Sequence, residues 1–195
     1  MSSTLASFGL RPVWHPSGTI RPTMYTPVDA TQAAYATKLY MGTPVVLNTD
    51  SSINIAAYNA AWLGVFQGCS YLDSTGKPVI SNFWPGTTTG ATQIKIYVTD
   101  DPQIVYEAQC SATVAATAIG DQLTTFDGTY TIGHGSTSTG LSDAAFSGSL
   151  AGASSQGSCR IVGVATYPDN AWGDTYPILQ VRIANQQFVY PQTAV

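Results

Sequence analysis

Charged side chains are scarce in this chain: they make up 9% of its 195 residues, against roughly 25% in a typical soluble protein. Seven basic and eleven acidic residues give a formal net charge of −4, and the basic ones are scattered singly between Arg11 and Arg182. Because recognition of a phosphate backbone requires a basic cluster, we expect no nucleic-acid partner. Ser, Thr, Asn, Gln and Gly must cover the surface, and such a surface suits packing against other protein.

Long apolar runs are also missing. No stretch approaches the length of about 20 residues that a helix needs to cross a bilayer. The segment 1–12, MSSTLASFGLRP, lacks the basic and apolar regions of a secretory leader. The expectation is therefore a protein made in the cytoplasm of its host, with no membrane partner.

Cysteine is present in an odd number and without metal-ligand spacing. Cys69, Cys110 and Cys159 form no CxxC pair, which argues against a disulfide framework and against a structural zinc site. We expect three buried thiols that fill space in the core. The sequence predicts no metal and no cofactor.

Residues that carry catalysis are equally rare. His134 has Asp127, Asp143 and several serines nearby in the sequence, so a Ser-His-Asp arrangement can be drawn. No GxSxG motif is present to expose a nucleophile, however, and we interpret His134 as a turn or interface residue. The chain has a single glutamate, Glu107. An enzyme is not predicted.

One acidic and aromatic segment, YPDNAWGD at 167–174, stands out as a possible surface ligand turn. An aromatic platform beside acids and amides is typical of sugar or Ca²⁺ sites. The alternative is that these residues bond to the backbone of their own turn. The candidate residues are Asp169, Asn170, Trp172 and Asp174.

Apolar residues alternate with period two along most of the chain, which predicts strands. The stretch 42–84 indicates a meander, 91–110 indicates two antiparallel strands joined at Asp100-Asp101-Pro102, and 160–166 and 178–183 are two further strands. In that hairpin Lys95 and Glu107 would face each other. The fold class is all-β, with a single compact β-barrel or β-sandwich domain. One or two short helical turns are expected, in 30–40, in the alanine-rich segment after Cys110, or at Ser142.

Residues 1–40 form an extended, proline-rich N-terminal arm, and 41–195 form the body, with a Gly/Ser-rich excursion at 127–158. The arm contains too many large apolar residues for a solvated tail. It either straps its own barrel or reaches an adjacent subunit. The residues expected to make its contacts are Phe8, Arg11, Trp14, His15 and Arg21.

Several segments together resemble a known family: FGLRPVWHPSGTIRP in the arm, AAWLGVFQGCSYLD and GKPVISNFWP after it, and RIVGVATYPDNAWGDTYPILQVRI near the end. This pattern is similar to the head decoration, or cement, proteins of tailed bacteriophages. The resemblance implies a tulip-like or barrel-shaped β-module that forms homotrimers on the outer capsid surface of the virion. Its partner would be the major capsid protein, whose neighbouring subunits it clamps in the expanded head. The alternative is a receptor- or carbohydrate-binding virion module that uses the turn around Trp172.

Overall fold

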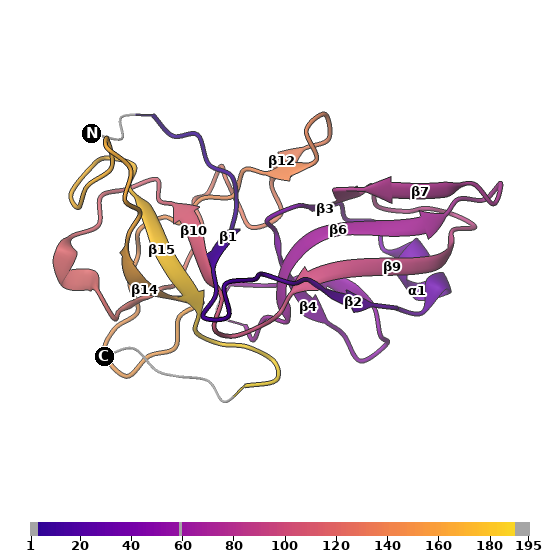
Figure 1. Cartoon of the computed structure of the whole chain (residues 1–195), viewed down its shortest axis with the longest axis horizontal. Coiled ribbons are helices and arrows are strands. Elements are labelled where there is room, and N and C mark those ends of the chain that lie inside the picture. Colours follow the sequence, from indigo (N-terminus) through magenta and orange to yellow (C-terminus); the bar gives the residue numbers. More distant parts are fainter. Residues whose placement is uncertain (1–3, 59, 190–195) are drawn as a thin grey trace.

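The computed structural model describes residues 4–58 and 60–189. Fifteen named strands, all paired antiparallel, one short α-helix and one 3-10 turn make up this part of the chain. The predicted all-β class is confirmed. Figure 1 shows the strands in two groups that lie side by side, with the chain crossing between them several times.

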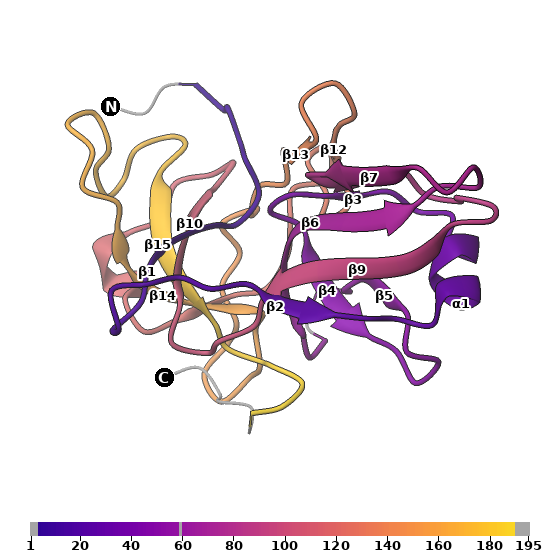
Figure 2. The same ribbon diagram turned by 45° about the vertical axis from the view of Figure 1, so that its right-hand side comes forward.

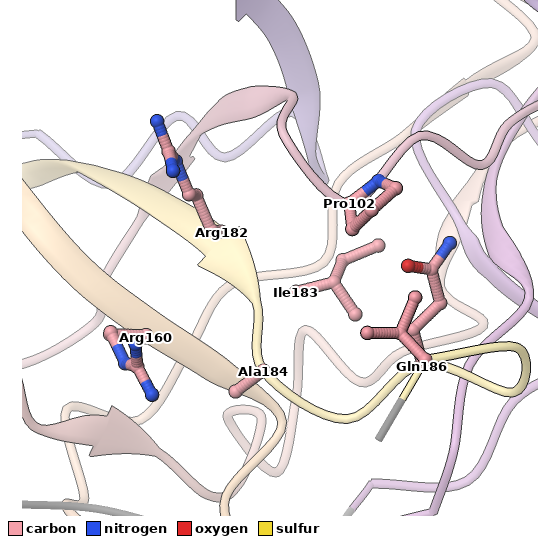
Figure 3. A pocket seen from close by; sticks show the side chains of 7 residues that line it. Pro102, Arg160, Arg182, Ile183, Ala184 and Gln186 are labelled. Carbon is pink, nitrogen blue, oxygen red and sulfur yellow. The ribbon is translucent and has the colours of Figure 1, made fainter. Parts of the chain in front are cut away.

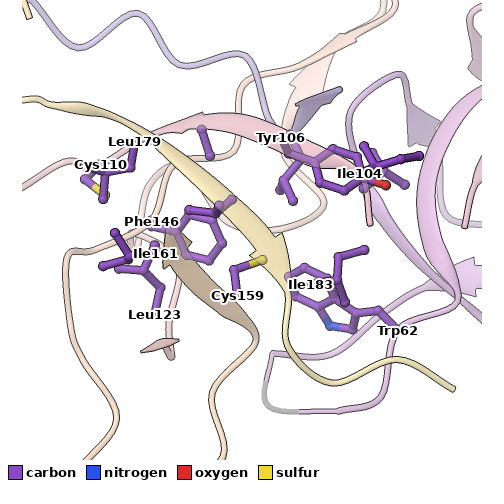
Figure 4. Packing of buried hydrophobic residues seen from close by; sticks show 14 of the residues in the cluster. Trp62, Ile104, Tyr106, Cys110, Leu123, Phe146, Cys159, Ile161, Leu179 and Ile183 are labelled. Carbon is purple, nitrogen blue, oxygen red and sulfur yellow. The ribbon is translucent and has the colours of Figure 1, made fainter. Parts of the chain in front are cut away.

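The first group is a five-stranded sheet, with its own hydrophobic core. Along β15 the residues Leu179, Val181 and Ile183 are buried while their neighbours face outward, as period two requires. They pack with Tyr106, Phe146 and other large side chains in one cluster (Figure 4). The order of strands is β1 (Arg11–Trp14), β10 (Val105–Gln109), β15 (Ile178–Ile183), β14 (Cys159–Val164) and β11 (Gln122–Leu123).

The second group is a six-stranded sheet with a separate core that contains Val45, Phe66, Trp84 and Ile96. The helix α1 (Asp29–Ala34) lies at its far end and contacts β9 (Figure 1). The order is β2 (Thr23–Tyr25), β9 (Thr92–Thr99), β6 (Gly64–Leu72), β4 (Pro44–Leu47) and β5 (Ile53–Ile55), and β7 (Pro78–Ser81) also pairs with β6. A short ladder of β3 (Leu39–Tyr40) with β8 (Phe83–Trp84) lies beside it.

The meander predicted over 42–84 is wrong in its pairing, although its strands exist. Both β5 and β6 pair with β4, one on each side, so β6 does not follow β5 in the sheet. The other edge of β6 pairs with β9, and β7 pairs with the C-terminal half of β6, beyond the residues that pair with β4. Alternation fixes which residues point inward, but it does not determine which strand lies next to which.

The predicted hairpin over 91–110 is also wrong. β9 belongs to the second sheet and β10 to the first, so the turn at Asp100 and Asp101 carries the chain from one core to the other. Lys95 consequently lies opposite Ser70, and Glu107 lies opposite Arg11 and Gln180. The two strands bury their apolar faces in different clusters, which a hairpin could not do.

The Gly/Ser-rich excursion contains a two-residue ladder of β12 (Gly135–Ser136) with β13 (Leu141–Ser142). The helical turn considered at Ser142 does not form, because Ser142 lies in β13 and its hydroxyl accepts the backbone N–H of Ala144. Helical structure occurs at α1 and at the 3-10 turn η1 (Ala116–Ala118), as predicted. Phe146 anchors the excursion in the first core, stacked on Phe126 at 4.4 Å between ring centroids.

The N-terminal arm adds an edge strand to each sheet. β1 pairs with β10 in the first sheet, and β2 pairs with β9 in the second. Figure 2 shows the chain turning back after β1 and running across the front of the molecule to β2. Within a single chain the arm is therefore a strap that joins the two sheets.

All three cysteines are buried free thiols, as predicted. Burial raises the pKa of Cys69 and of Cys110 to about 12 and raises that of Cys159 as well, because the thiolate is poorly solvated in the core. We expect the native protein to react with no equivalent of Ellman's reagent at pH 8, and the unfolded protein in guanidinium chloride to react with three. Rapid reaction of the native protein would contradict this packing.

Candidate functional site

The two carboxylates at the turn between the sheets hold the arm in place. Asp100 accepts hydrogen bonds from the hydroxyl groups of Thr23 (2.7 Å) and Tyr25 (2.6 Å), both in β2. Asp101 lies 3.1 Å from Nε2 of His15, which follows β1. Burial, together with the bond to Asp100, raises the pKa of the Tyr25 hydroxyl, so it remains a donor. The acidic turn thus contacts β2 and the residue that follows β1.

A second set of contacts fixes the start of the arm. Arg11 donates to the carboxylate of Glu107 at 2.6 Å and to the hydroxyl of Tyr167 at 2.8 Å, and Tyr167 donates to the same carboxylate at 2.7 Å. The side chain of Glu107 is 8% exposed and that of Arg11 is 51% exposed. The bond to Glu107 raises the pKa of Tyr167. The ring of Phe8 lies under the guanidinium of Arg11, 4.6 Å from its centroid.

The five predicted contact residues of the arm fall into three places. Phe8 and Arg11 line a mostly apolar hollow of about 190 Å³ together with Met41. His15 and Arg21 line a more polar hollow of about 360 Å³. Trp14, which lies between Arg11 and His15 in the sequence, is 51% exposed on the edge strand β1 of the first sheet.

Trp14 and other outward-facing residues of the same sheet define a surface, which we call the outer face of the first sheet; on it β10 and β15 lie between β1 and β14. Trp14 lies opposite Val105, whose neighbour Tyr106 points into the core, so both Trp14 and Val105 are on the outer side. Exposed apolar side chains on β1, on β14 and on the loop after β14 belong to this face: Val13, Trp14, Val162 and Tyr167.

Sequence reasoning missed Val162 and Tyr167. The alternation of β14 marks Val162 as outward, since Ile161 is buried. The alternation can be recognised in the sequence. It identifies Val162 as a neighbour on the face of Trp14 only if β1 and β14 belong to one sheet, and no local pattern indicates that they do. Tyr167 was assigned only to an aromatic turn, whereas its hydroxyl completes the contact of Arg11 with Glu107.

The predicted ligand turn is used largely for its own bracing. Asn170 donates to the carbonyls of Ala165 and Ile178 and accepts the N–H of Ile178, so its amide closes the connection between β14 and β15. Asp174 accepts the N–H of Ala171 and is 7% exposed. Trp172 packs partly against the first core, and Asp169 is exposed. Among the described residues no cluster of three metal-ligating side chains occurs.

His134 does meet one of the two aspartates near it in the sequence. Its Nδ1 lies 2.5 Å from Oδ1 of Asp143, while Asp127 instead accepts the hydroxyl of Ser111. In the part of the chain that the structure describes, no serine hydroxyl bonds to the ring of His134; the hydroxyl of Ser142 donates to its backbone carbonyl. The contact between His134 and Asp143 joins the residue before β12 to the residue after β13.

No helix within residues 4–58 and 60–189 is long and apolar enough to span a bilayer. Comparison of the chain with family models, with curated proteins and with solved structures finds no match in any of the three.

The contacts of Asp100 predict that the arm is part of the cooperative fold. We expect Tyr25→Phe, which removes the donor to a half-buried carboxylate, to lower the free energy of unfolding by about 1–2 kcal/mol, measured by urea denaturation. Tyr58→Phe is the matched control, because Tyr58 is 55% exposed. Equal stabilities for the two variants would show that the bond from Tyr25 to Asp100 contributes nothing to the free energy of unfolding.

Asp127 predicts acid sensitivity of the excursion. The hydroxyl of Ser111 and the N–H groups of Thr129 and Tyr130 hold the pKa of Asp127 below its usual range. Its contribution to stability is therefore present above the pKa of the unfolded state, about 3.9, and is lost as the pH falls through the lower folded value. Between pH 7 and pH 3 the Tm of the wild type should fall further than that of Asp127→Asn. An equal fall in Tm for the wild type and Asp127→Asn would contradict the stabilising role given to the Asp127 carboxylate.

Proposed function

We propose that this chain is a structural virion protein that binds the outer surface of a protein shell, the expanded head of a tailed phage. The observation that carries the proposal is the outer face of the first sheet. There Trp14 is 51% exposed, Val162 41%, Tyr167 39% and Val13 36%. A sheet face with this many exposed apolar side chains favours contact with another protein.

The chemistry of this face supports a protein partner. Tryptophan, tyrosine and arginine are the residues most often found at the energetic centre of protein interfaces, and charged residues are depleted there. Arg11 and Trp14 share β1, the hydroxyl of Tyr167 accepts from Arg11, and Glu107 neutralises the charge of Arg11. The low overall charge adds little long-range repulsion between the chain and a shell.

The rigidity of the arm supports the same proposal. Trp14 and Arg11 belong to a strand that is hydrogen-bonded to β10, so their positions are set before binding. A preorganised surface loses less conformational entropy on association than a free tail would. Within the single chain, the backbone of both strands of the arm is paired with the chain's own sheets.

In this proposal the chain acts as a homotrimer that clamps neighbouring subunits of the major capsid protein. Symmetric linkage of three weak contacts gives strong binding without a large individual interface. Preference for the expanded head over the procapsid then stabilises the shell by mass action. A role as a receptor- or carbohydrate-binding module has less support, because Asn170, Trp172 and Asp174 are occupied in bracing their turn.

The proposal predicts selective binding to expanded heads. In co-sedimentation the wild type should bind undecorated expanded heads saturably, bind procapsids weakly, and raise the melting temperature of the expanded shell. Trp14→Ala should weaken binding about tenfold or more, as expected for an aromatic anchor. Trp14 is exposed, so the variant should keep its fold, which circular dichroism checks.

Ile80→Ala is the matched control. Ile80 is 87% exposed on β7, in the other group of strands, and its truncation should leave binding unchanged. Absence of binding to either particle would overturn the proposed function. A loss in Ile80→Ala equal to that in Trp14→Ala would overturn the assignment of the face.

A further inference from the structure

Positive charge is concentrated on the strands of the first sheet. Three of the chain's four arginines lie there, Arg11 in β1, Arg160 in β14 and Arg182 in β15. The one acidic residue on these strands is Glu107 in β10. Three arginines against one glutamate make the strands of this sheet formally positive, although the whole chain has a net charge of −4.

Two of these arginines lie side by side on the outer face of the first sheet. Arg160 is paired in register with Arg182 across neighbouring strands. The residues next to them in the sequence, Ile161 and Val181, are buried in the first core. Because side chains alternate along a strand, both arginines are on the side of the sheet away from that core.

The register of the sheet connects these arginines to Trp14. Tyr106 lies opposite Val181, so the next step of the same antiparallel register brings Val105 beside Arg182. Val105 in turn lies opposite Trp14. One row across the outer face therefore begins at the exposed tryptophan and ends at the two arginines.

The charges of Arg160 and Arg182 are not compensated within the described residues. Glu107 neutralises Arg11, whereas none of the ion pairs found in that part of the chain includes Arg160 or Arg182. Only the Nε atom of each is buried, so the terminal nitrogens of both guanidinium groups reach solvent. Like charges opposite each other weaken a ladder, and departures from such a local rule are expected at functional sites.

The two guanidinium groups point away from each other (Figure 3). They do not converge on one small anion. Their charges are instead spread over the face, where each terminal group can meet a separate acceptor. This arrangement suits a broad surface with several anionic groups.

We propose that the outer face of the first sheet is complementary to a carboxylate-rich protein surface, toward which Arg160 and Arg182 steer the chain. The inference rests on the proposed function for the use of this face and adds the chemistry of the surface that it meets. Charges beside an apolar contact chiefly raise the rate and the selectivity of association. Two free arginines are too few for the run of phosphate contacts that a nucleic acid makes.

The charge preference can be tested without a shell, by the fluorescence anisotropy of a labelled oligoglutamate peptide. The wild type should bind it saturably at about 0.1 M salt, where a Debye length of about 10 Å screens the more distant charges of the chain. The double variant Arg160→Gln, Arg182→Gln should bind about fivefold more weakly, as expected for two exposed charge contacts. Circular dichroism checks that it is folded.

Lys77→Gln is the matched control for the loss of a positive charge. Lys77 is exposed in the turn before β7, in the other group of strands, and its variant should bind oligoglutamate as the wild type does. No saturable binding by the wild type, or an equal loss in Lys77→Gln, would overturn the inference and leave shell binding through Trp14 untouched. Tighter binding of an oligothymidylate with the same charge would overturn it in favour of a nucleic-acid partner.

Association with expanded heads, followed by surface plasmon resonance, separates this inference from the proposed function. The double variant should associate about fivefold more slowly and with less dependence on salt, while its dissociation rate stays close to that of the wild type. Trp14→Ala should instead dissociate faster. An association rate insensitive both to salt and to the double substitution would overturn the steering role. Absence of binding to heads, with oligoglutamate binding intact, would overturn the shell proposal alone.

Discussion

The turn at Asp100 and Asp101 is one of the places where the chain passes from one sheet to the other, and the same turn contacts β2 of the N-terminal arm and His15, which follows β1. Asp100 is held by Thr23 and Tyr25, and Asp101 lies against His15. The backbone at this point is braced from the core side too, since the hydroxyl of Tyr106 donates to the carbonyl of Thr99. Because the two sheets have separate hydrophobic clusters, these polar contacts help to fix one sheet relative to the other.

This arrangement determines what the arm can do. The two strands of the proline-rich, apolar arm complete the edges of the chain's own sheets. The consequence is a rigid outer face on which Trp14 stands next to Arg11, rather than a flexible tail. Binding through such a face depends on complementary shape and on a few anchors.

Local patterns in the sequence were sufficient for the class of fold and for several strands. The strands over 160–166 and 178–183, the buried thiols and the short helical segments were all predictable, because alternation, residue type and alanine content act locally. Pairing was not predictable in the same way. Lys95 and Glu107 had suitable spacing for a hairpin, yet the chain between them passes from one core to the other.

In the candidate sites too, some features follow from local sequence and others only from the pairing of strands. The arm residues Phe8, Arg11 and Trp14 were identifiable from their chemistry, whereas the contribution of Tyr167 arises only when β14 and β1 come together in one sheet. The pairing of Arg160 with Arg182 likewise depends on register, since the two residues are far apart in the sequence and neither lies in a basic cluster.

Electron cryo-microscopy of expanded heads saturated with the protein tests the central claim most directly. The account predicts density for the chain on the outside of the shell, with the outer face of the first sheet, around Trp14 and Tyr167, turned toward the capsid subunits. Density in which β7 and the second sheet contact the shell while Trp14 faces solvent would contradict it.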